Sequence, residues 1–174
     1  MFYAVIAVVI ALLLSNKQST APVSVDDLFK EAGEKYDVDP VLIKAVASVE
    51  SSLDPRAYNP ADPSYGLMQV LCKPDGNGGC SNVFNIDSWP PESAEELYDP
   101  SINIGYGAQI LAHNIKTYGF RKGIAVYNSW SARHDPDNGP FVNQDYVDKV
   151  LAKFYSFGGI DPWLYSTSGS YLSK

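Results

Sequence analysis

Residues 39–55 constrain the fold of this chain more than any other segment, because they predict a helix that carries one carboxylate into an apolar setting. Asp39 can cap the first free N–H groups, Pro40 suits the first helical position, and Pro55 disfavours helix at the residue before it. At about 100° per residue, the apolar positions of this helix fall on one stripe and the polar positions on the opposite one. The apolar stripe consists of Leu42, Val46, Val49 and Leu53, and the polar stripe of Lys44, Ser48 and Ser51.

Glu50 is the unusual residue of this helix, because it lies beside the apolar stripe rather than with the polar positions. Burial disfavours a charged carboxyl, and the last turn of a helix presents partial negative charge, so both effects should raise the pKa of Glu50. A carboxylic acid that stays protonated near neutral pH can give a proton to the leaving oxygen of a glycosidic bond. The alternative is structural: Glu50 could be buried against a Lys or Arg from elsewhere in the chain.

Length and charge limit the classes of protein to be considered. With 174 residues, of which 45% are hydrophobic, the chain can form one domain with a substantial core plus an N-terminal segment. The formal net charge is −7, with 20 acidic and 13 basic residues and no basic cluster, so we expect no nucleic-acid partner.

The first residues form a hydrophobic segment. Residues 2–14 are an unbroken apolar run, which as a helix would cover roughly 20 Å, short of a comfortable bilayer span. This length suits a signal peptide, but no Lys or Arg precedes the run, and Pro22 follows a poor cleavage site. We expect residues 1–21 to form a hydrophobic N-terminal helix that is a signal or, with slight preference, an uncleaved membrane anchor. A helix buried inside the domain is the alternative.

Cys72 and Cys80 enclose a short polar loop. Outside the cytosol a disulfide closing this loop would contribute roughly 2–3 kcal/mol to stability, whereas two free thiols are the alternative. Within the loop, residues 75–79 resemble the start of a calcium-binding loop. Gly79 occupies the place of an oxygen ligand and Ile86 that of the closing Glu, so we expect no calcium there.

The rest of the sequence indicates an all-α domain over residues 22–159, followed by a C-terminal tail over residues 160–174. Helices are expected over residues 25–36, from Pro100 to Gly119, from about Arg121 through Trp130, and from Asn143 to Gly158. Residues 54–65 and 131–140 read as coil and polar loop. Residues 66–71 predict a short buried strand or extended segment, in which Gln69 could simply be bonded to the backbone.

Four short motifs follow one another along the chain. They are Ala-Ser-Val-Glu-Ser-Ser-Leu-Asp-Pro at 47–55, Ser-Tyr-Gly-Leu-Met-Gln-Val at 64–70, Ala-Val-Tyr-Asn at 125–128 and Asp-Tyr-Val at 145–147. In this order they resemble the catalytic domain of soluble lytic transglycosylases, of the goose-type-lysozyme-like superfamily. The resemblance covers roughly residues 25–157. It implies a compact, lysozyme-like helical domain around a glycan-binding cleft.

The resemblance also implies an activity. Such an enzyme cleaves the β-1,4 bond between N-acetylmuramic acid and N-acetylglucosamine in peptidoglycan, and the C6 hydroxyl of the muramic acid closes a 1,6-anhydro ring. One carboxyl, here Glu50, would act first as acid and then as base, without metal or cofactor. The resemblance places further residues around it: Ser51 would orient Glu50, Tyr146 would hydrogen-bond it, and the cleft would be lined by Met68, Gln69, Tyr127 and Asn128.

Two departures from the family pattern border the expected cleft. Ser129 and Trp130 follow Asn128 where the family often continues with Ala-Gly, and the Cys72 to Cys80 loop lengthens the segment after Gln69. Both leave open how many sugars are bound and whether chain ends or interiors are cut. His113 and His134 are expected to be surface or core residues.

Three other functions remain open at this stage. A hydrolytic lysozyme would use a second acid such as Asp54, Asp62 or Asp135 to position water, and a peptidoglycan-binding module would hold glycan without cutting it. The hydrophobic N-terminus also suits a component of an envelope-crossing machine for secretion, conjugation or phage entry. In each case we expect the domain on the extracytoplasmic, periplasmic side of a membrane, anchored, secreted or virion-associated.

Overall fold

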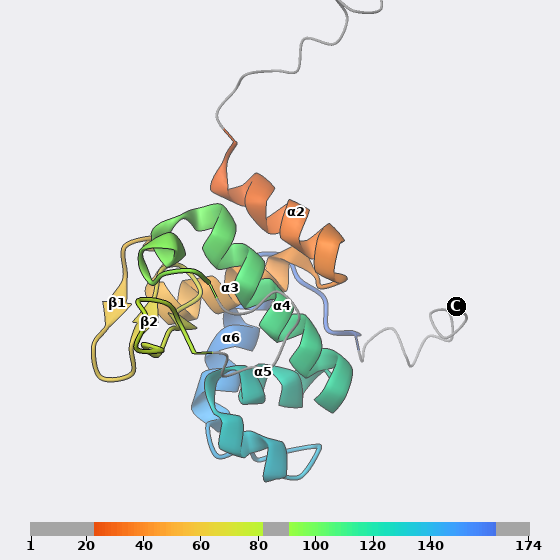
Figure 1. Cartoon of the computed structure of the whole chain (residues 1–174). Coiled ribbons are helices and arrows are strands. Elements are labelled where there is room, and N and C mark those ends of the chain that lie inside the picture. Colours follow the sequence, from red (N-terminus) through yellow and green to blue (C-terminus); the bar gives the residue numbers. More distant parts are fainter. Residues whose placement is uncertain (1–22, 82–90, 163–174) are drawn as a thin grey trace, which may run out of the picture.

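A computed structural model describes residues 23–81 and 91–162. The described elements are α2 (Val25–Tyr36), α3 (Pro40–Ser51), β1 (Tyr58–Asn59), β2 (Ser64–Tyr65), β3 (Val70–Leu71), η1 (Glu95–Tyr98), α4 (Pro100–Tyr118), α5 (Phe120–Asn128), η2 (Trp130–His134) and α6 (Gln144–Ser156). Helices dominate, as the sequence predicts, and Figure 1 shows them gathered into one body with the small sheet at its edge. The hydrophobic segment expected over residues 1–21 lies outside the described residues.

Helix starts are set by the capping residues that the sequence indicates. Ser24 accepts a hydrogen bond from the Asp27 N–H at the start of α2, and Asp39 accepts one from the Val41 N–H at the start of α3. Asp99 opens α4 in the same way, and the helix ends before Gly119. Each cap satisfies N–H groups that have no partner inside the helix, so these boundaries follow from local chemistry.

Two boundaries near the C-terminal half differ from the expectation. Helix α5 ends at Asn128, and Trp130 lies in the 3-10 helix η2, which occupies the first part of the expected polar loop. Asn143 precedes α6 but makes no capping bond. Its Nδ2 donates instead to the Ala125 carbonyl and to Asn128 Oδ1, because the end of α5 lies close enough to compete for the amide.

The three short strands form an antiparallel sheet in the order β1-β2-β3. Tyr58 pairs with Tyr65, and Tyr65 in turn with Val70. The expectation of coil over residues 54–65 is therefore wrong at β1 and β2, where the turn-rich sequence masks two hairpin strands. The extended segment expected at residues 66–71 is confirmed at its end by β3.

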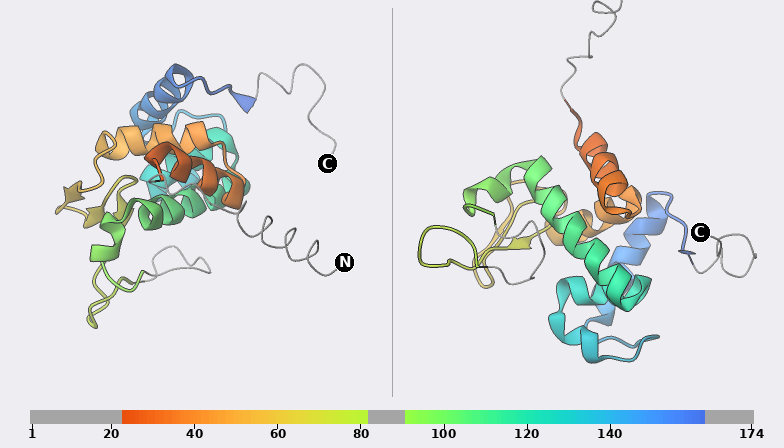
Figure 2. Two further views of the ribbon diagram at one scale, coloured as in Figure 1. Left: turned by 90° about the horizontal axis from the view of Figure 1, so that it is seen from above. Right: turned by 45° about the vertical axis from the view of Figure 1, so that its right-hand side comes forward.

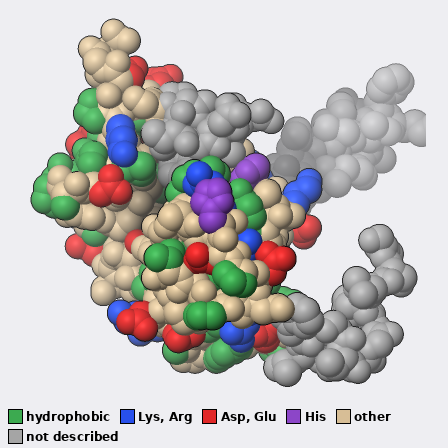
Figure 3. All heavy atoms as spheres, turned by 90° about the horizontal axis from the view of Figure 1, so that it is seen from below, with side chains coloured by type: hydrophobic (Ala, Val, Ile, Leu, Met, Phe, Trp, Pro, Cys, Tyr) green, Lys and Arg blue, Asp and Glu red, His purple; other side chains and the backbone are tan. Residues whose placement is uncertain are grey.

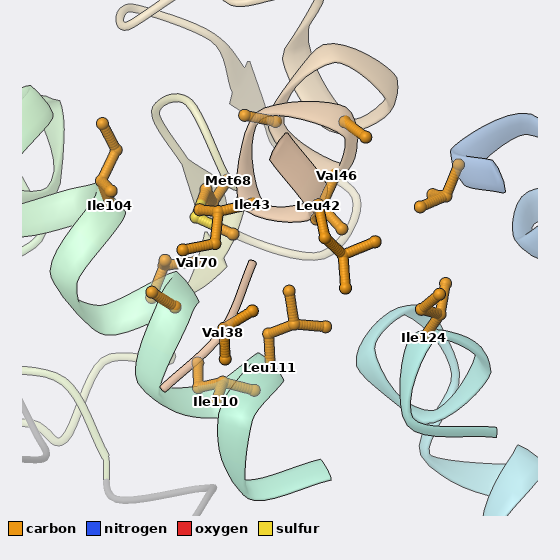
Figure 4. Packing of buried hydrophobic residues seen from close by; sticks show 14 of the residues in the cluster. Val38, Leu42, Ile43, Val46, Met68, Val70, Ile104, Ile110, Leu111 and Ile124 are labelled. Carbon is orange, nitrogen blue, oxygen red and sulfur yellow. The ribbon is translucent and has the colours of Figure 1, made fainter. Parts of the chain in front are cut away.

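Helix α3 lies among the other helices and packs against α2, α4 and α6, while α4 packs against α2 and α5 (Figures 1 and 2). Leu42, Ile43 and Val46 of α3 are at most 1% exposed. Figure 4 shows Leu42, Ile43 and Val46 of α3 together with Ile110 and Leu111 of α4 in the same core. The helix that carries Glu50 is thus held on several sides by apolar packing.

Asn103 of α4 joins this helix to the segment between β2 and β3. Its Oδ1 accepts from the Met68 N–H at 2.7 Å, and its Nδ2 donates to the carbonyls of Tyr65 and Leu97 at 2.7 and 2.8 Å. The residue is fully buried. Gly66 lies against the same amide with φ of 69°, and an added Cβ there would collide with Asn103 and with the Leu97 carbonyl.

On the face shown in Figure 3, side chains of both charge signs are interspersed, and the described residues there form no large patch of one sign. Within residues 23–81 and 91–162, no helix has the length and apolarity needed to cross a bilayer.

Candidate active site

Glu50 lies in the last turn of α3, partly buried, where it borders two hollows of the surface. Among the described residues no Lys or Arg pairs with it, so the structural alternative of a buried ion pair is not what this fold presents. Its polar partner is the hydroxyl of Tyr146, which donates to Oε1 at 2.6 Å.

Burial raises the pKa of Glu50 from its ordinary value of 4.5 to about 7, although the hydrogen bond from Tyr146 favours the ionised form and lowers it. Desolvation has the larger effect because, among the described residues, Tyr146 is the one donor that the charged carboxylate gains in exchange for its lost hydration. At neutral pH both protonation states are therefore populated. A carboxyl of this kind can give up a proton and take one back within one reaction cycle.

Two tyrosines flank the carboxyl. Burial, and then the nearby charge of Glu50, raise the pKa of both Tyr127 and Tyr146 well above the usual value, so both stay protonated. Tyr146 uses its proton on Glu50, whereas Tyr127 donates to the Met68 carbonyl at 2.8 Å. Tyr127 thereby fixes the segment that contains Met68, and its hydroxyl is not used on the Glu50 carboxyl.

Ser51 was expected to orient Glu50, and the structure gives it an indirect position. Its Oγ lies 3.1 Å from the Ala47 carbonyl and 2.8 Å from the Leu67 carbonyl, not on the carboxyl. The hydrogen bond to the Leu67 carbonyl joins the end of α3 to the segment that carries Gln69. Ser52 and Leu53 follow in the left-handed region with φ of 58° and 64°, so the chain turns sharply after the helix.

Met68 differs from the expectation that it lines the cleft. Its side chain is 0% exposed, beside Ile43 in the core (Figure 4), and it packs so closely on Gly107 that a Cβ there would collide with it. Because the side chain is needed to fill the space between α3 and α4, only its backbone contributes near the site. Its N–H is held by Asn103 and its carbonyl by Tyr127.

Gln69 lies in the cleft wall, but its amide is already engaged. Nε2 donates to the carbonyls of Gly66 at 2.9 Å and Ala57 at 3.3 Å, which is the backbone role that the sequence left open. These bonds hold the residue at φ of 47°, a conformation that costs a non-glycine residue free energy. What remains for a ligand is Oε1, an acceptor.

Asn128 lies where the two hollows meet, since it lines both together with Glu50. Its Oδ1 accepts from Asn143 Nδ2 at 2.9 Å, which orients the amide and leaves Nδ2 without a partner among the described residues. Asn143 Oδ1 is buried without any hydrogen-bond partner in the described structure. The end of α5 therefore offers one donor beside the carboxyl, Asn128 Nδ2, whereas Asn143 Oδ1 is too deeply buried to reach a ligand.

The main cleft has a volume of about 670 Å³ and runs between the small sheet and the helices α4, α5 and η2. Its lining comprises Glu50, Asn59, Asp62, Ser64, Gln69, Val70, Leu71, Lys73, Ile110, Asn114, Val126, Tyr127, Asn128 and Trp130. The second cleft, of about 630 Å³, lies between α3 and α6 and is lined by residues of both, including Glu50, Tyr146 and Lys149. Glu50 thus lines both clefts.

Several lining residues escaped the sequence analysis as site residues. Asn114 is an amide on the buried side of α4. A polar residue at a core-facing position of a predicted helix is the sequence signal that points to it. Trp130 was noticed only as a departure from the family pattern. Lys73 comes from a loop and has no sequence signal, whereas the sequence points to Asp62 only as the second acid of a hydrolytic lysozyme. Lys73 Nζ and Asp62 Oδ1 lie 3.9 Å apart at the sheet side of the cleft.

Cys72 and Cys80 are joined by a disulfide that closes the loop after β3. Asp75 within this loop accepts from the N–H groups of Asn77 and Gly79, so its carboxylate organises a turn. Among the described residues, no group of three or more His, Cys, Asp or Glu is placed to hold a metal ion.

Comparison with known proteins identifies relatives of this chain. The sequence pattern of the transglycosylase SLT domain matches residues 27–139. A membrane-bound lytic murein transglycosylase C from Edwardsiella ictaluri is 38% identical over 93 residues, which are 53% of this chain and 24% of that protein. A membrane-bound lytic murein transglycosylase E from Buchnera aphidicola is 37% identical over 87 residues, 50% of this chain and 38% of that protein.

Solved structures give the same result for the fold. An inactive mutant of the lytic transglycosylase Slt from Pseudomonas aeruginosa superposes with a TM-score of 0.62 at 20% identity, covering 79% of this chain and 24% of that one. The 70 kDa soluble lytic transglycosylase from Escherichia coli gives 0.58 at 26% identity, covering 79% and 25%. The chain spans about a quarter of the length of these larger proteins.

Proposed function

The chain belongs to the transglycosylase SLT domain family, and from this premise we propose that it is a peptidoglycan lytic transglycosylase. It cleaves the β-1,4 bond between N-acetylmuramic acid and N-acetylglucosamine and leaves a 1,6-anhydro end. The observation that carries the proposal is Glu50, a carboxyl with a pKa raised to about 7 that lies between two clefts and is held by Tyr146.

In the first step the protonated Glu50 gives its proton to the bridging oxygen as the bond from that oxygen to C1 of the muramic acid breaks. The leaving N-acetylglucosamine end becomes a hydroxyl, and Glu50 becomes a carboxylate. The Tyr146 hydroxyl, 2.6 Å from Oε1, is then a donor to a charged acceptor, and such a bond is stronger than one to the neutral acid.

In the second step the carboxylate takes the proton from the C6 hydroxyl while that oxygen bonds to C1. Glu50 is then protonated again, and no water is consumed. One carboxyl whose pKa lies near the working pH suits both halves of this cycle, since neither protonation state is strongly disfavoured.

The clefts support binding of glycan on both sides of the broken bond. Asn128 lines both clefts, and its Nδ2 has no partner among the described residues, while Gln69 lines the main cleft with Oε1 available as an acceptor. These groups can hydrogen-bond the acetamido and hydroxyl groups of a strand that passes over Glu50. Ser51 positions Glu50 indirectly, through its bond to the Leu67 carbonyl.

Hydrolysis is the second candidate, because Asp62 also lines the main cleft. In that reaction a second carboxylate would position water, and the product would carry a reducing end. The side chain of Asp62 is 63% exposed and its Oδ1 lies 3.9 Å from Lys73 Nζ, so it is in a well-hydrated place at the edge of the cleft. This environment favours the transglycosylase.

We further propose an extracytoplasmic, periplasmic location, where peptidoglycan is found, with residues 1–21 as anchor or signal. The disulfide between Cys72 and Cys80 fits an oxidising compartment. Membership in an envelope-crossing machine would require a partner, and crosslinking in cells that yields a freely diffusing protein without partners would contradict it.

The test is mass spectrometry of muropeptides released from purified peptidoglycan by the full chain. The wild type should release 1,6-anhydro products, each lighter by one water than its hydrolytic counterpart, and Glu50→Gln should lower the rate at least about a hundredfold. Asp62→Asn should leave the anhydro products in place. Reducing ends from the wild type, lost in Asp62→Asn, would establish the hydrolase, and absence of any release would refute both.

A further inference from the structure

Asn114 of α4 is a largely buried residue whose side-chain amide has no hydrogen-bond partner among the described residues. Its side chain belongs to a residue that is only 4% exposed, it lines the main cleft, and no described residue makes a hydrogen bond with its amide group. Among the fully buried side-chain N and O atoms of the described residues, only Asn143 Oδ1 lacks a hydrogen-bond partner, so the unbonded amide atoms of Asn114 are reached from the cleft. An unpaired amide that faces a cleft is therefore a candidate to bind a ligand.

Trp130 lies in the lining of the same cleft and is 57% exposed. The Arg133 guanidinium lies 4.5 Å from the centre of its ring, and the Arg133 side chain also donates to the Trp130 carbonyl at 2.9 Å. These contacts hold the indole at the surface of the cleft, although burying it in the core would have been favourable.

The element that carries Trp130 is itself fixed. Ala132 of η2 is fully buried. After η2, the buried Lys122 of α5 donates from Nζ to the Asp135 carbonyl at 2.8 Å and to Asp137 Oδ1 at 2.9 Å. The indole is thus preorganised, and a ligand that packs on it has little ordering cost to overcome.

The chemistry of this part of the cleft suits an uncharged amphipathic ring. Ile110 and Val126 supply apolar lining near the Asn114 amide, and the indole supplies a flat apolar face. A sugar ring presents C–H groups on one face. Its acetamido group has one N–H and one carbonyl, which match the acceptor and donor of an Asn side chain.

We propose that Trp130 and Asn114 form a binding subsite for one N-acetylhexosamine unit of the glycan strand, additional to the units held at Glu50. The sugar ring stacks on the indole, and its acetamido group pairs with the Asn114 amide. This proposal rests on the proposed function for the identity of the ligand. With this subsite, the main cleft would bind one sugar more than the units held at Glu50.

The subsite is tested by calorimetric titration of the full chain carrying Glu50→Gln with N-acetylglucosamine oligomers of increasing length. Affinity should rise with length until this subsite is filled. Adding Trp130→Ala or Asn114→Leu should remove the last rise, a loss of about tenfold, with little effect on shorter oligomers. Phe157→Ala is the matched control, since Phe157 is also an exposed aromatic beside a cation, Lys44, but lies outside both clefts.

Thermal unfolding separates binding from structure. If Asn114 serves the ligand, Asn114→Leu should leave the Tm unchanged or raise it, because the amide faces the cleft and its removal breaks no hydrogen bond between described residues. A fall in Tm together with lost binding would assign Asn114 a structural role and overturn its part in the subsite. Equal affinities of the Trp130→Ala and parent proteins for every oligomer would overturn the part of Trp130.

The two proposals can fail separately. Release of anhydro muropeptides by the wild type, without any length-dependent loss in the two variants, leaves the enzyme assignment in place and refutes the subsite. Loss of oligomer binding in both variants, in a protein that releases no muropeptides, supports the subsite and refutes the enzyme.

Discussion

Helix α4 carries two buried asparagines about three turns apart, hence on nearly the same face, and they are used in opposite ways. Asn103 makes three hydrogen bonds to backbone groups of the described chain, whereas Asn114 makes none through its side chain. The first lies behind the segment between β2 and β3, and the second lines the main cleft. The difference indicates that the hydrogen-bonded Asn103 stabilises the fold behind the cleft, whereas Asn114 remains available to bind a ligand.

Glu50 extends the comparison. Its carboxyl has one donor, Tyr146, and no cation among the described residues, so the fold leaves it short of partners as it does Asn114. On the structural side, the Met68 backbone is held at both its N–H and its carbonyl. Substitution of a residue with all its partners, such as Asn103, should therefore lower stability. Substitution of a residue short of partners, such as Glu50, should raise it.

The largest effect is expected at Asn103. Asn103→Leu leaves one N–H and two carbonyl groups buried without partners, which should lower the free energy of unfolding by about 4 kcal/mol. Urea denaturation followed by circular dichroism measures this, with His113→Ala on the exposed side of α4 as control. If Asn103→Leu lowered the free energy of unfolding no more than His113→Ala does, Asn103 would not be a structural residue.

Glu50→Gln should have the opposite sign. The folded protein raises the pKa of Glu50 from 4.5 to about 7, so the protonated carboxyl is tolerated below pH 4.5 and the penalty of ionisation grows as the pH rises to 7. Above pH 7, Glu50→Gln should be more stable than the wild type by roughly 3 kcal/mol, and at pH 4 the two should be nearly equal. Unfolding curves at pH 4 and pH 8 decide this. A stability difference that does not depend on pH would contradict the penalty.

A smaller effect is expected for Tyr146→Phe. The lost hydrogen bond favours the ionised carboxyl, so its removal should raise the pKa of Glu50 further and move the alkaline limit of kcat/KM to higher pH. The maximal rate should fall about tenfold because the carboxyl is less well oriented. If Tyr146 had a merely structural role, Tyr146→Phe would lower the rate and leave the pH profile unchanged. Measuring kcat/KM as a function of pH distinguishes the two outcomes.

Much of the fold follows from local sequence. Caps at Ser24, Asp39 and Asp99 set three helix starts, and the position of Glu50 beside the apolar stripe gave the direction of its pKa. These features depend on neighbours within a turn or two. The family resemblance supplied Tyr146, whose partner lies 96 positions away in the sequence.

The remaining features depend on tertiary contacts that no local pattern encodes. Met68 is buried because Gly107 leaves room for it, and Asn143 turns from its helix end because Asn128 and Ala125 lie nearby. Asn103 and Asn114 are the same residue type on one helix face. Only the segment packed against each of them distinguishes the structural amide from the one left for a ligand.

The most direct test of the central claim is a ¹³C NMR titration of the Glu50 carboxyl in the folded chain, assigned by its absence in Glu50→Gln. The account predicts a midpoint near pH 7, with the side chain largely protonated at pH 6. A midpoint near the ordinary value of 4.5 would mean that Glu50 is ionised throughout the neutral range. It could not then serve as the acid of the first step, and the single-carboxyl mechanism would be wrong.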